Sequence, residues 1–201
     1  MTDGCESWEF SNNTSDHCLF KSAASAGMGK DFEARYPKDY TDYTNLLALL
    51  EWVVSCNSEE ATGDALAESV TIDGTTYTND TAAYRIAKFK DELSDHFNLE
   101  YVLTYYIAVE LFGMVESRAK NLFLNTYDGQ IWYPVFYDLD TAFGLNNEGV
   151  NDFSYNIEFH DVIGTQNVYN GESSVLWNMV ERAYPSEIQT LYQKGWKNLI
   201  L

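Results

Sequence analysis

The sequence predicts an α+β fold, in which short strands open the chain and helices form most of its body. Residues 1–37 alternate short apolar runs with turn-forming clusters, which is typical of strands. From residue 38 onward, apolar residues recur at helical spacing over several long segments. One strand–turn–strand unit, at 121–137, interrupts these helices. A helical body with two small β regions is therefore expected.

The first region, 1–37, is predicted to contain three short strands. Trp8–Phe10 precedes a turn-forming cluster at 11–16, a second strand follows at 18–21, and a small-residue loop separates it from Phe32–Tyr36. Pro37 stops the third strand, because proline cannot donate to a β ladder. Three short strands cannot bury a sheet face alone. We therefore expect them to pair with the helical body, with a partner or with further chain.

The second region, 38–201, is predicted to be mainly helical. Asp42 or Thr44 can cap a helix with apolar residues up to position 54, and Asp80 or Thr81 can cap another that runs to position 93. Asn98 caps a helix that is apolar nearly all round, so this helix is expected to be the centre of the core. The remaining predicted elements are a hairpin at 70–77, a hairpin at 121–137, and helices at about 173–184 and 186–199.

The charge balance is strongly acidic, with 12 Lys+Arg against 31 Asp+Glu and a net charge of −19. This excludes nucleic acid and anionic membrane surfaces as partners, because both require clustered cations on the protein. An ATP-like anion could dock only with divalent cations that offset both charges. Met1 is not followed by a signal peptide, and no apolar stretch is long enough to span a bilayer. We therefore expect a soluble protein that is made in the cytoplasm.

Three cysteines, Cys5, Cys18 and Cys56, form no CxxC pair and no metal-binding spacing. An odd number of cysteines without such spacing predicts free thiols in a reducing compartment.

Four residues carry the candidate chemistry: Glu116, Asn121, Asp138 and Asp140. Glu116 and Asn121 lie in a short loop between the apolar helix and the hairpin, and Asp138 follows the second strand of that hairpin. Hairpin pairing is expected to bring Asn121 near the end that carries Asp138. Carboxylate and amide oxygens are hard ligands that suit Mg²⁺ or Mn²⁺ and not zinc. The alternative is a solvated turn, a helix cap and a buried amide that braces the loop.

The same order of residues occurs in protein kinases, where acid-x-x-x-x-Asn precedes a short hairpin and a metal-binding Asp. The segments ESRAKNLFL at 116–124 and WYPVFYDLDTAFG at 132–144 resemble the spore-coat CotH kinase-like family. FEARYP at 32–37 resembles an earlier strand of that family. The likeness extends to NNEG at 146–149 and VLWN at 175–178 and is closest to CotH-like proteins of gut bacteria and their phages.

This resemblance implies an atypical, protein-kinase-like fold that transfers phosphate from ATP to Ser or Thr of a protein, with Mg²⁺ or Mn²⁺. Residues 38–201 would form the helical C-lobe, with the metal-site hairpin at 116–149, and residues 1–37 a small incomplete N-lobe strand segment. Asn121 and Asp138 would be metal ligands, and Asp140 a second ligand or a residue that orients the loop. Glu116 would be the catalytic base, and Lys21 could mimic the phosphate-pairing lysine.

Two departures from the family pattern leave the function open. The family has Asp where this chain has Glu116, and no glycine-rich phosphate loop is visible, so the chain resembles the C-terminal part of a longer protein. The first hypothesis is therefore a CotH-like kinase with a protein substrate. The second is a catalytically degenerate, pseudokinase-like structural or interaction module, such as a component of a phage particle or a coat. The third is a metal-dependent hydrolase that uses the same carboxylates.

Overall fold

A computed structural model describes residues 4–10, 32–56, 70–78, 81–114, 117, 122–140, 142–145, 149–150 and 175–200. Within these residues, helices and antiparallel strands combine in one structure, so the predicted α+β class is confirmed. None of the described helices is long and apolar enough to cross a membrane.

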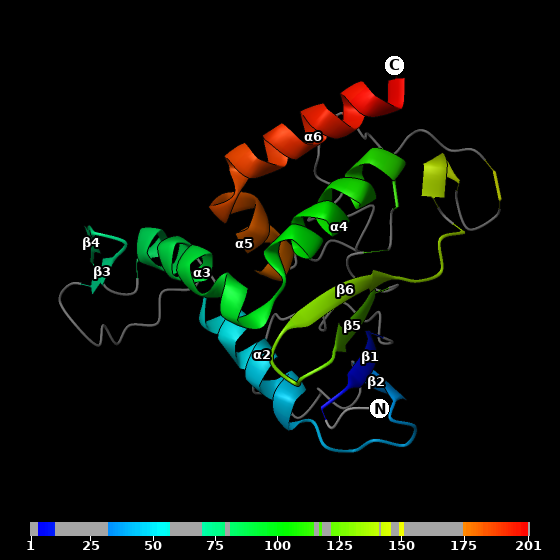
Figure 1. Ribbon diagram of the computed structural model, residues 1–201, viewed down its shortest axis with the longest axis horizontal. Helices are drawn as coiled ribbons and strands as arrows, with labels where there is room; N and C mark the ends of the chain where they lie inside the picture. The colour runs from blue at the N-terminus through cyan, green and yellow to red at the C-terminus, as the bar shows by residue number, and fades with distance from the viewer. Residues whose placement is uncertain are drawn as a thin grey trace.

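The main sheet has four strands in the order β2-β1-β5-β6 (Figure 1). They are β1 (Glu6–Phe10), β2 (Phe32–Tyr36), β5 (Leu122–Thr126) and β6 (Trp132–Phe136), and each neighbouring pair is antiparallel. The two front strands therefore pair with each other and, through β1, with the later hairpin, which was not among the expected partners. The predicted strand at 18–21 lies outside the described residues. The predicted division at residue 37 stays a prediction, although this sheet contains strands from both sides of it.

A second, two-stranded sheet is the hairpin of β3 (Val70–Ile72) and β4 (Thr75–Tyr77). Its turn is the predicted Asp73-Gly74 pair, and both residues have positive φ, 47° and 75°. Asp and Gly tolerate this left-handed backbone better than other residues do, so the local sequence specifies the turn.

The helices lie close to their predicted positions, although the helix after Thr81 runs to His96 and not only to position 93. They are α2 (Thr44–Ser55), α3 (Ala82–His96), α4 (Leu99–Phe112), α5 (Val175–Ala183) and α6 (Pro185–Ile200), with a short 3₁₀ turn η1 (Ala142–Gly144). Thr81 and Asn98 cap α3 and α4, since their side chains accept hydrogen bonds from the backbone N–H groups of Tyr84 and Tyr101. Helix α4 ends at Phe112 and not near 115, because Gly113 takes a left-handed conformation and closes the helix.

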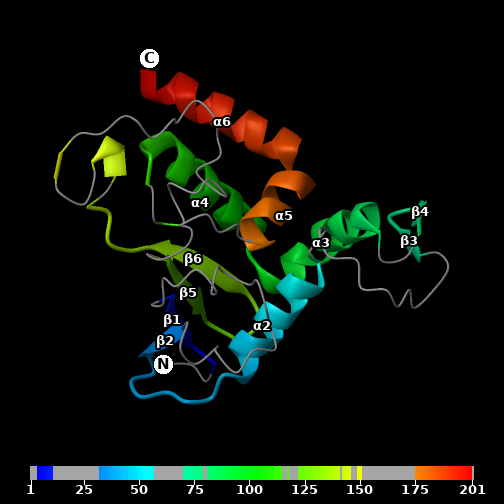
Figure 2. The same cartoon turned by 180° about the vertical axis from the view of Figure 1, so that it is seen from behind.

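Helix α4 lies between the main sheet and α6, with α5 beside it (Figures 1 and 2). Seven of its residues are buried, which confirms its predicted place at the centre of the core. The largest fully buried side chains include Trp8 and Trp132 from the sheet, Tyr105 from α4 and Trp177 from α5. Large aromatic side chains of the sheet, of α4 and of α5 therefore belong to one buried core.

Asp128 stabilises the turn between β5 and β6. Its Oδ1 accepts hydrogen bonds from the backbone N–H groups of Gln130 and Ile131, each at 2.9 Å. Gly129 beside it has φ 77°, which strains a residue with a Cβ, and a Cβ there would also lie 2.7 Å from Nδ2 of Asn45, so glycine is favoured. The hydrogen bonds from Gln130 and Ile131 favour the ionised carboxyl and hold the pKa of Asp128 below its usual value.

We expect the stabilising effect of Asp128 to depend on pH. Because its pKa is lower in the folded state, its contribution is present above the unfolded pKa of about 4 and is lost as the pH falls through the folded value. The loss should be at most about 1 kcal/mol, since solvent screens an exposed carboxylate. Urea unfolding of the chain and of Asp128→Asn at about pH 7 and about pH 3 measures it. An equal difference between the two proteins at both pH values would contradict the assignment.

Candidate functional site

The β5–β6 hairpin brings two distant segments to one end of the sheet. Leu122 pairs with Phe136, and the ladder continues to Thr126 opposite Trp132. The chain therefore enters β5 and leaves β6 at the same end of the hairpin. Asp138 follows Phe136 by two residues, and Asn121 directly precedes Leu122 in the sequence. The described pairing is the one that the predicted site requires.

Two ring stacks hold the end of β6 on opposite faces. The ring of Phe136 stacks on Tyr105 of α4, with centroids 4.3 Å apart and an interplanar angle of 14°. The ring of Tyr137 stacks on Phe123 of β5, at 4.6 Å and 20°. Successive side chains of a strand point to opposite faces, so one stack faces the helices and the other the outer surface. Asp138 therefore leaves the sheet from a point that is fixed on both sides.

Asp138 itself is exposed and has a left-handed backbone, with φ 53°. Asp tolerates this conformation because its short polar side chain can bond locally. Two residues further on, Asp140 is also exposed. The structure thus places both predicted carboxylates on the surface, in the short segment that leaves β6.

Phe143 was not singled out as a site residue from the sequence. It has φ 59° within η1, an unusual conformation for a bulky residue, and its side chain is 66% exposed. Its ring lies 5.2 Å from that of Phe112 at the end of α4. Left-handed residues therefore flank Asp140 on both sides. Backbone strain of this kind is frequent at functional segments. The sequence gives no signal of it, since Phe rarely has a positive φ and its residue type predicts the opposite.

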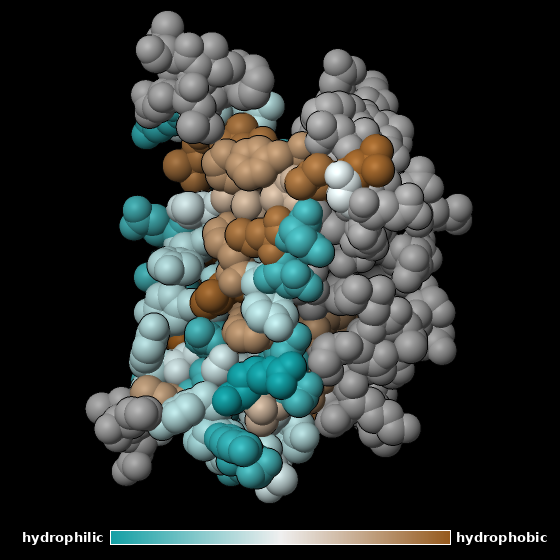
Figure 3. Space-filling model, turned by 90° about the vertical axis from the view of Figure 1, so that its right-hand side faces the viewer, coloured by the Kyte–Doolittle hydropathy of each residue, from teal (hydrophilic) through white to brown (hydrophobic). Residues whose placement is uncertain are grey.

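The surface around this segment is partly hydrophobic. Leu139, Phe143 and Val150 are exposed, and Figure 3 shows the side of the molecule on which η1 and the end of β6 lie. Hydrophobic and hydrophilic areas adjoin each other there. In the chain, the exposed Leu139 therefore lies directly between the two exposed carboxylates.

Glu116, Asn121 and Lys21 lie outside the described residues, so their predicted roles stay predictions. Among the described residues, no three His, Cys, Asp or Glu side chains come together as a metal site. Asp138 and Asp140 supply hard oxygen donors whose chemistry fits Mg²⁺ or Mn²⁺. Two carboxylates do not complete the coordination of either ion.

Tyr105 is a second residue that sequence reasoning did not assign to the site. Its hydroxyl donates a hydrogen bond to the backbone oxygen of Ser117, which is 3% exposed and follows Glu116 in the chain. Its ring lies between Phe136 and Trp177, whose centroid is 5.5 Å away. A buried tyrosine hydroxyl needs a polar partner, and this rule is the one sequence signal that could have indicated its role.

Three other titratable groups serve the fold. Burial raises the pKa of Cys56 to about 11, so this thiol stays protonated and packs as an apolar side chain. Burial lowers the pKa of His96, whose ring stacks on Trp52 at 4.1 Å. Arg35 is paired with Glu9 and Glu33, and the hydrogen bond to Glu9 is the main cause of its raised pKa.

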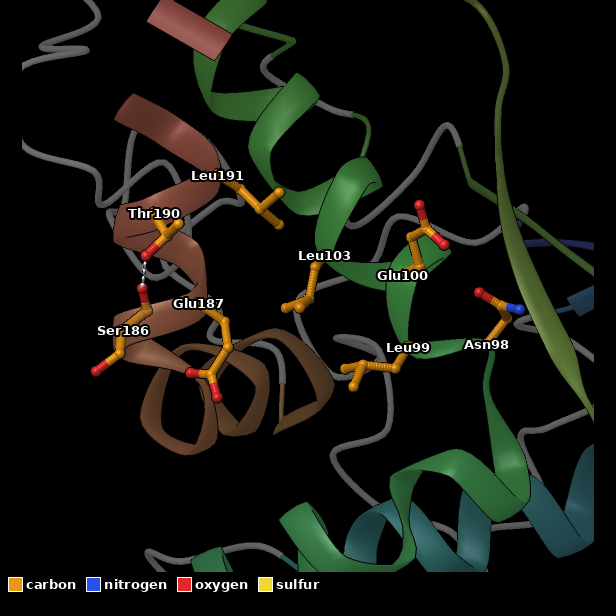
Figure 4. Close-up of a pocket in the computed structure, with 8 residues that line it drawn as sticks. All are labelled: Asn98, Leu99, Glu100, Leu103, Ser186, Glu187, Thr190 and Leu191. Atoms are coloured by element: carbon orange, nitrogen blue, oxygen red, sulfur yellow. Dashed lines mark hydrogen bonds between the residues drawn. The ribbon is translucent and has the colours of Figure 1, made fainter. Parts of the chain in front are cut away.

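A groove of about 740 Å³ lies elsewhere, between the first turns of α4 and α6 (Figure 4). Leucines from both helices line it, with two glutamates among its polar residues. Neither Asp138 nor Asp140 lines this groove. Ligand sites are usually concave and mostly apolar, but here the groove and the predicted metal ligands are separate.

The structure thus combines an α+β fold with a carboxylate-bearing segment after a hairpin, and a comparison with known families shows to which family the chain belongs. A family model described as CotH kinase protein matches residues 58–200. The matched residues include α3, α4, the β5–β6 hairpin, α5 and α6. The chain therefore belongs to the CotH kinase family, as its sequence resemblance predicted. No curated protein and no solved structure matches the chain. The expected closeness to proteins of gut bacteria and their phages stays a prediction.

Proposed function

We propose that the chain is a phosphotransferase of the CotH type, which uses ATP with Mg²⁺ or Mn²⁺ to phosphorylate Ser or Thr of a protein. One observation supports this most strongly. The β5–β6 hairpin and the ring stacks of Phe136 and Tyr137 hold Asp138 at one end of the sheet. Strand β5, which Asn121 directly precedes in the sequence, begins at the same end. A kinase-like arrangement of the helices around this hairpin is part of the proposal.

Each predicted residue has a role in this proposal. Asp138 and Asn121 would hold the cation, and Asp140 would add a second ligand or orient the segment after β6. Glu116 would accept the proton of the attacking hydroxyl, and Lys21 would contact the phosphates. When bound, the cation neutralises the charge of the phosphates, which a chain with a net charge of −19 would otherwise repel.

A second candidate is a kinase-like module without turnover, which acts as a structural or interaction protein. The observation that favours it is Glu116, where the resemblance expects Asp. The extra methylene displaces the carboxylate by about 1.5 Å, whereas catalytic groups tolerate displacements of about 0.5 Å. In this case the site would retain metal and nucleotide but not transfer phosphate.

Substitution of Glu116 by Asp separates the two candidates. We expect Glu116→Asp to raise phosphate transfer from γ-labelled ATP to an added Ser/Thr-rich protein by up to about 100-fold. The reason is that the shorter Asp side chain removes the displacement of the carboxylate that the extra methylene of Glu causes. The measurement is the initial rate of label transfer with Mn²⁺, with Mg²⁺ and with neither. Nucleotide binding without transfer by either protein would favour the degenerate module. Transfer that does not need a divalent cation would contradict the proposed function.

A further inference from the structure

Tyr105 connects the two segments on which the proposed site depends. Its side chain is 2% exposed and projects from the middle of α4. The hydroxyl bonds the backbone oxygen of Ser117, in the segment that precedes β5. The ring stacks on Phe136 at the end of β6, nearly parallel at 14°. One side chain therefore contacts both segments through two different groups.

The opposite face of the Tyr105 ring is also occupied. Trp177 of α5 stacks on it with an interplanar angle of 12°, and this tryptophan is fully buried. Phe136, Tyr105 and Trp177 thus form a column of nearly parallel rings from the end of the sheet to α5. Because the ring is confined on both faces and the core around it is closely packed, the hydroxyl has little freedom to leave Ser117.

We infer that Tyr105 is a positioning residue, which sets the place of the Ser117 segment relative to the end of β6. This inference rests on the proposed function, since Ser117 adjoins the predicted base Glu116 and Phe136 precedes the predicted ligand Asp138 by two residues. The hydroxyl positions the segment of the base, and the ring positions the segment of the metal ligand. The side chain does not contact the reacting groups in this scheme.

Two substitutions separate the two halves of this role. Tyr105→Phe removes the hydroxyl and keeps the ring between Phe136 and Trp177. Tyr105→Leu removes both the hydroxyl and the stack. Tyr106→Phe is the matched control, because Tyr106 is the next residue of α4 and is equally buried at 2%. Its hydroxyl is removed in the same way, while the bond from Tyr105 to Ser117 is retained.

Hydrogen exchange of the full chain without nucleotide gives a readout that does not need activity. For Tyr105→Phe we expect exchange to rise about tenfold in the peptide that contains Met114 and Ser117, because a buried carbonyl loses its donor. Exchange in the peptides of β6 and 138–145 should stay as in the parent chain. Tyr105→Leu should raise exchange in both regions, and Tyr106→Phe in neither.

Kinetics give the second readout. For Tyr105→Phe we expect kcat to fall about tenfold with the KM for ATP unchanged, whereas Tyr105→Leu should also raise that KM. Equal exchange in Tyr105→Phe and Tyr106→Phe would overturn the inference, and so would a uniform rise over the whole chain. An unchanged kcat in an active Tyr105→Phe protein would also overturn it. If the exchange pattern appears but no protein transfers phosphate, the link through Tyr105 stands and the proposed function fails.

Discussion

Asp138→Asn should reduce metal-dependent phosphate transfer on the order of 100- to 1,000-fold, which is the usual cost of losing one fixed charge-stabilising group in an active site. The substitution removes the negative charge and keeps the shape of the side chain. Asn also tolerates the left-handed backbone at this position, where φ is 53°, so the hairpin should stay folded. The loss would therefore report on the carboxylate and not on a misfolded segment. The measurement is the initial rate of label transfer from γ-labelled ATP at saturating Mn²⁺.

Asp73→Asn is the matched control for this experiment. Asp73 is exposed, has φ 47°, and lies in the turn between β3 and β4, outside the main sheet. Its substitution changes the net charge by the same amount, in the same backbone conformation. A loss of transfer that is equal in Asp73→Asn and Asp138→Asn would mean that charge or folding, and not a metal ligand, explains the effect.

Trp177→Ala should lower the free energy of unfolding by about 3–5 kcal/mol, as is usual when a large buried aromatic side chain is removed. Trp177 is fully buried, and its ring stacks on Tyr105 and lies 6.4 Å from Tyr106. The substitution would leave a cavity between α5 and α4 and remove one face of the ring column. Urea unfolding followed by circular dichroism measures the change.

The control for Trp177 is Tyr192→Ala on α6, where the side chain is 42% exposed. Removal of a surface side chain usually changes the free energy of unfolding by less than about 0.5 kcal/mol. A change for Trp177→Ala below about 1.5 kcal/mol would mean that the core closes around the gap and that the column is not a rigid element.

Features set by local sequence were predictable. Asn98 and Thr81 cap their helices through their own side chains, and Asp73-Gly74 forms its turn because both residues accept positive φ. The uniformly apolar stretch from Leu99 indicated a buried helix, since a helix without a polar face must be covered on all sides. These features depend on residues within one or two turns of each other, which a single sequence shows.

Features set by packing between distant segments were not predictable. The pairing of β1 with β5 joins Trp8 to Leu124 across more than half of the chain, and no local pattern selects this partner. The Tyr105 side chain bonds Ser117 and stacks on Trp177 of α5, and the sequence of α4 alone indicates neither partner. The positive φ of Phe143 opposes the preference of its own residue type, so only the surrounding structure can impose it.

The most direct test of the proposed site is the thermal unfolding of the full chain with ATP, with Mg²⁺, and with both together. A ligand that binds only the folded state adds about 2.7 kcal/mol of stability at one hundred times its dissociation constant. For a chain of this size that corresponds to a rise in Tm of roughly 5–10 °C. We predict this rise only when nucleotide and cation are both present, in the parent chain and in Asp73→Asn but not in Asp138→Asn. No rise under any condition, or an equal rise in Asp138→Asn, would contradict a metal–nucleotide site at the end of β6.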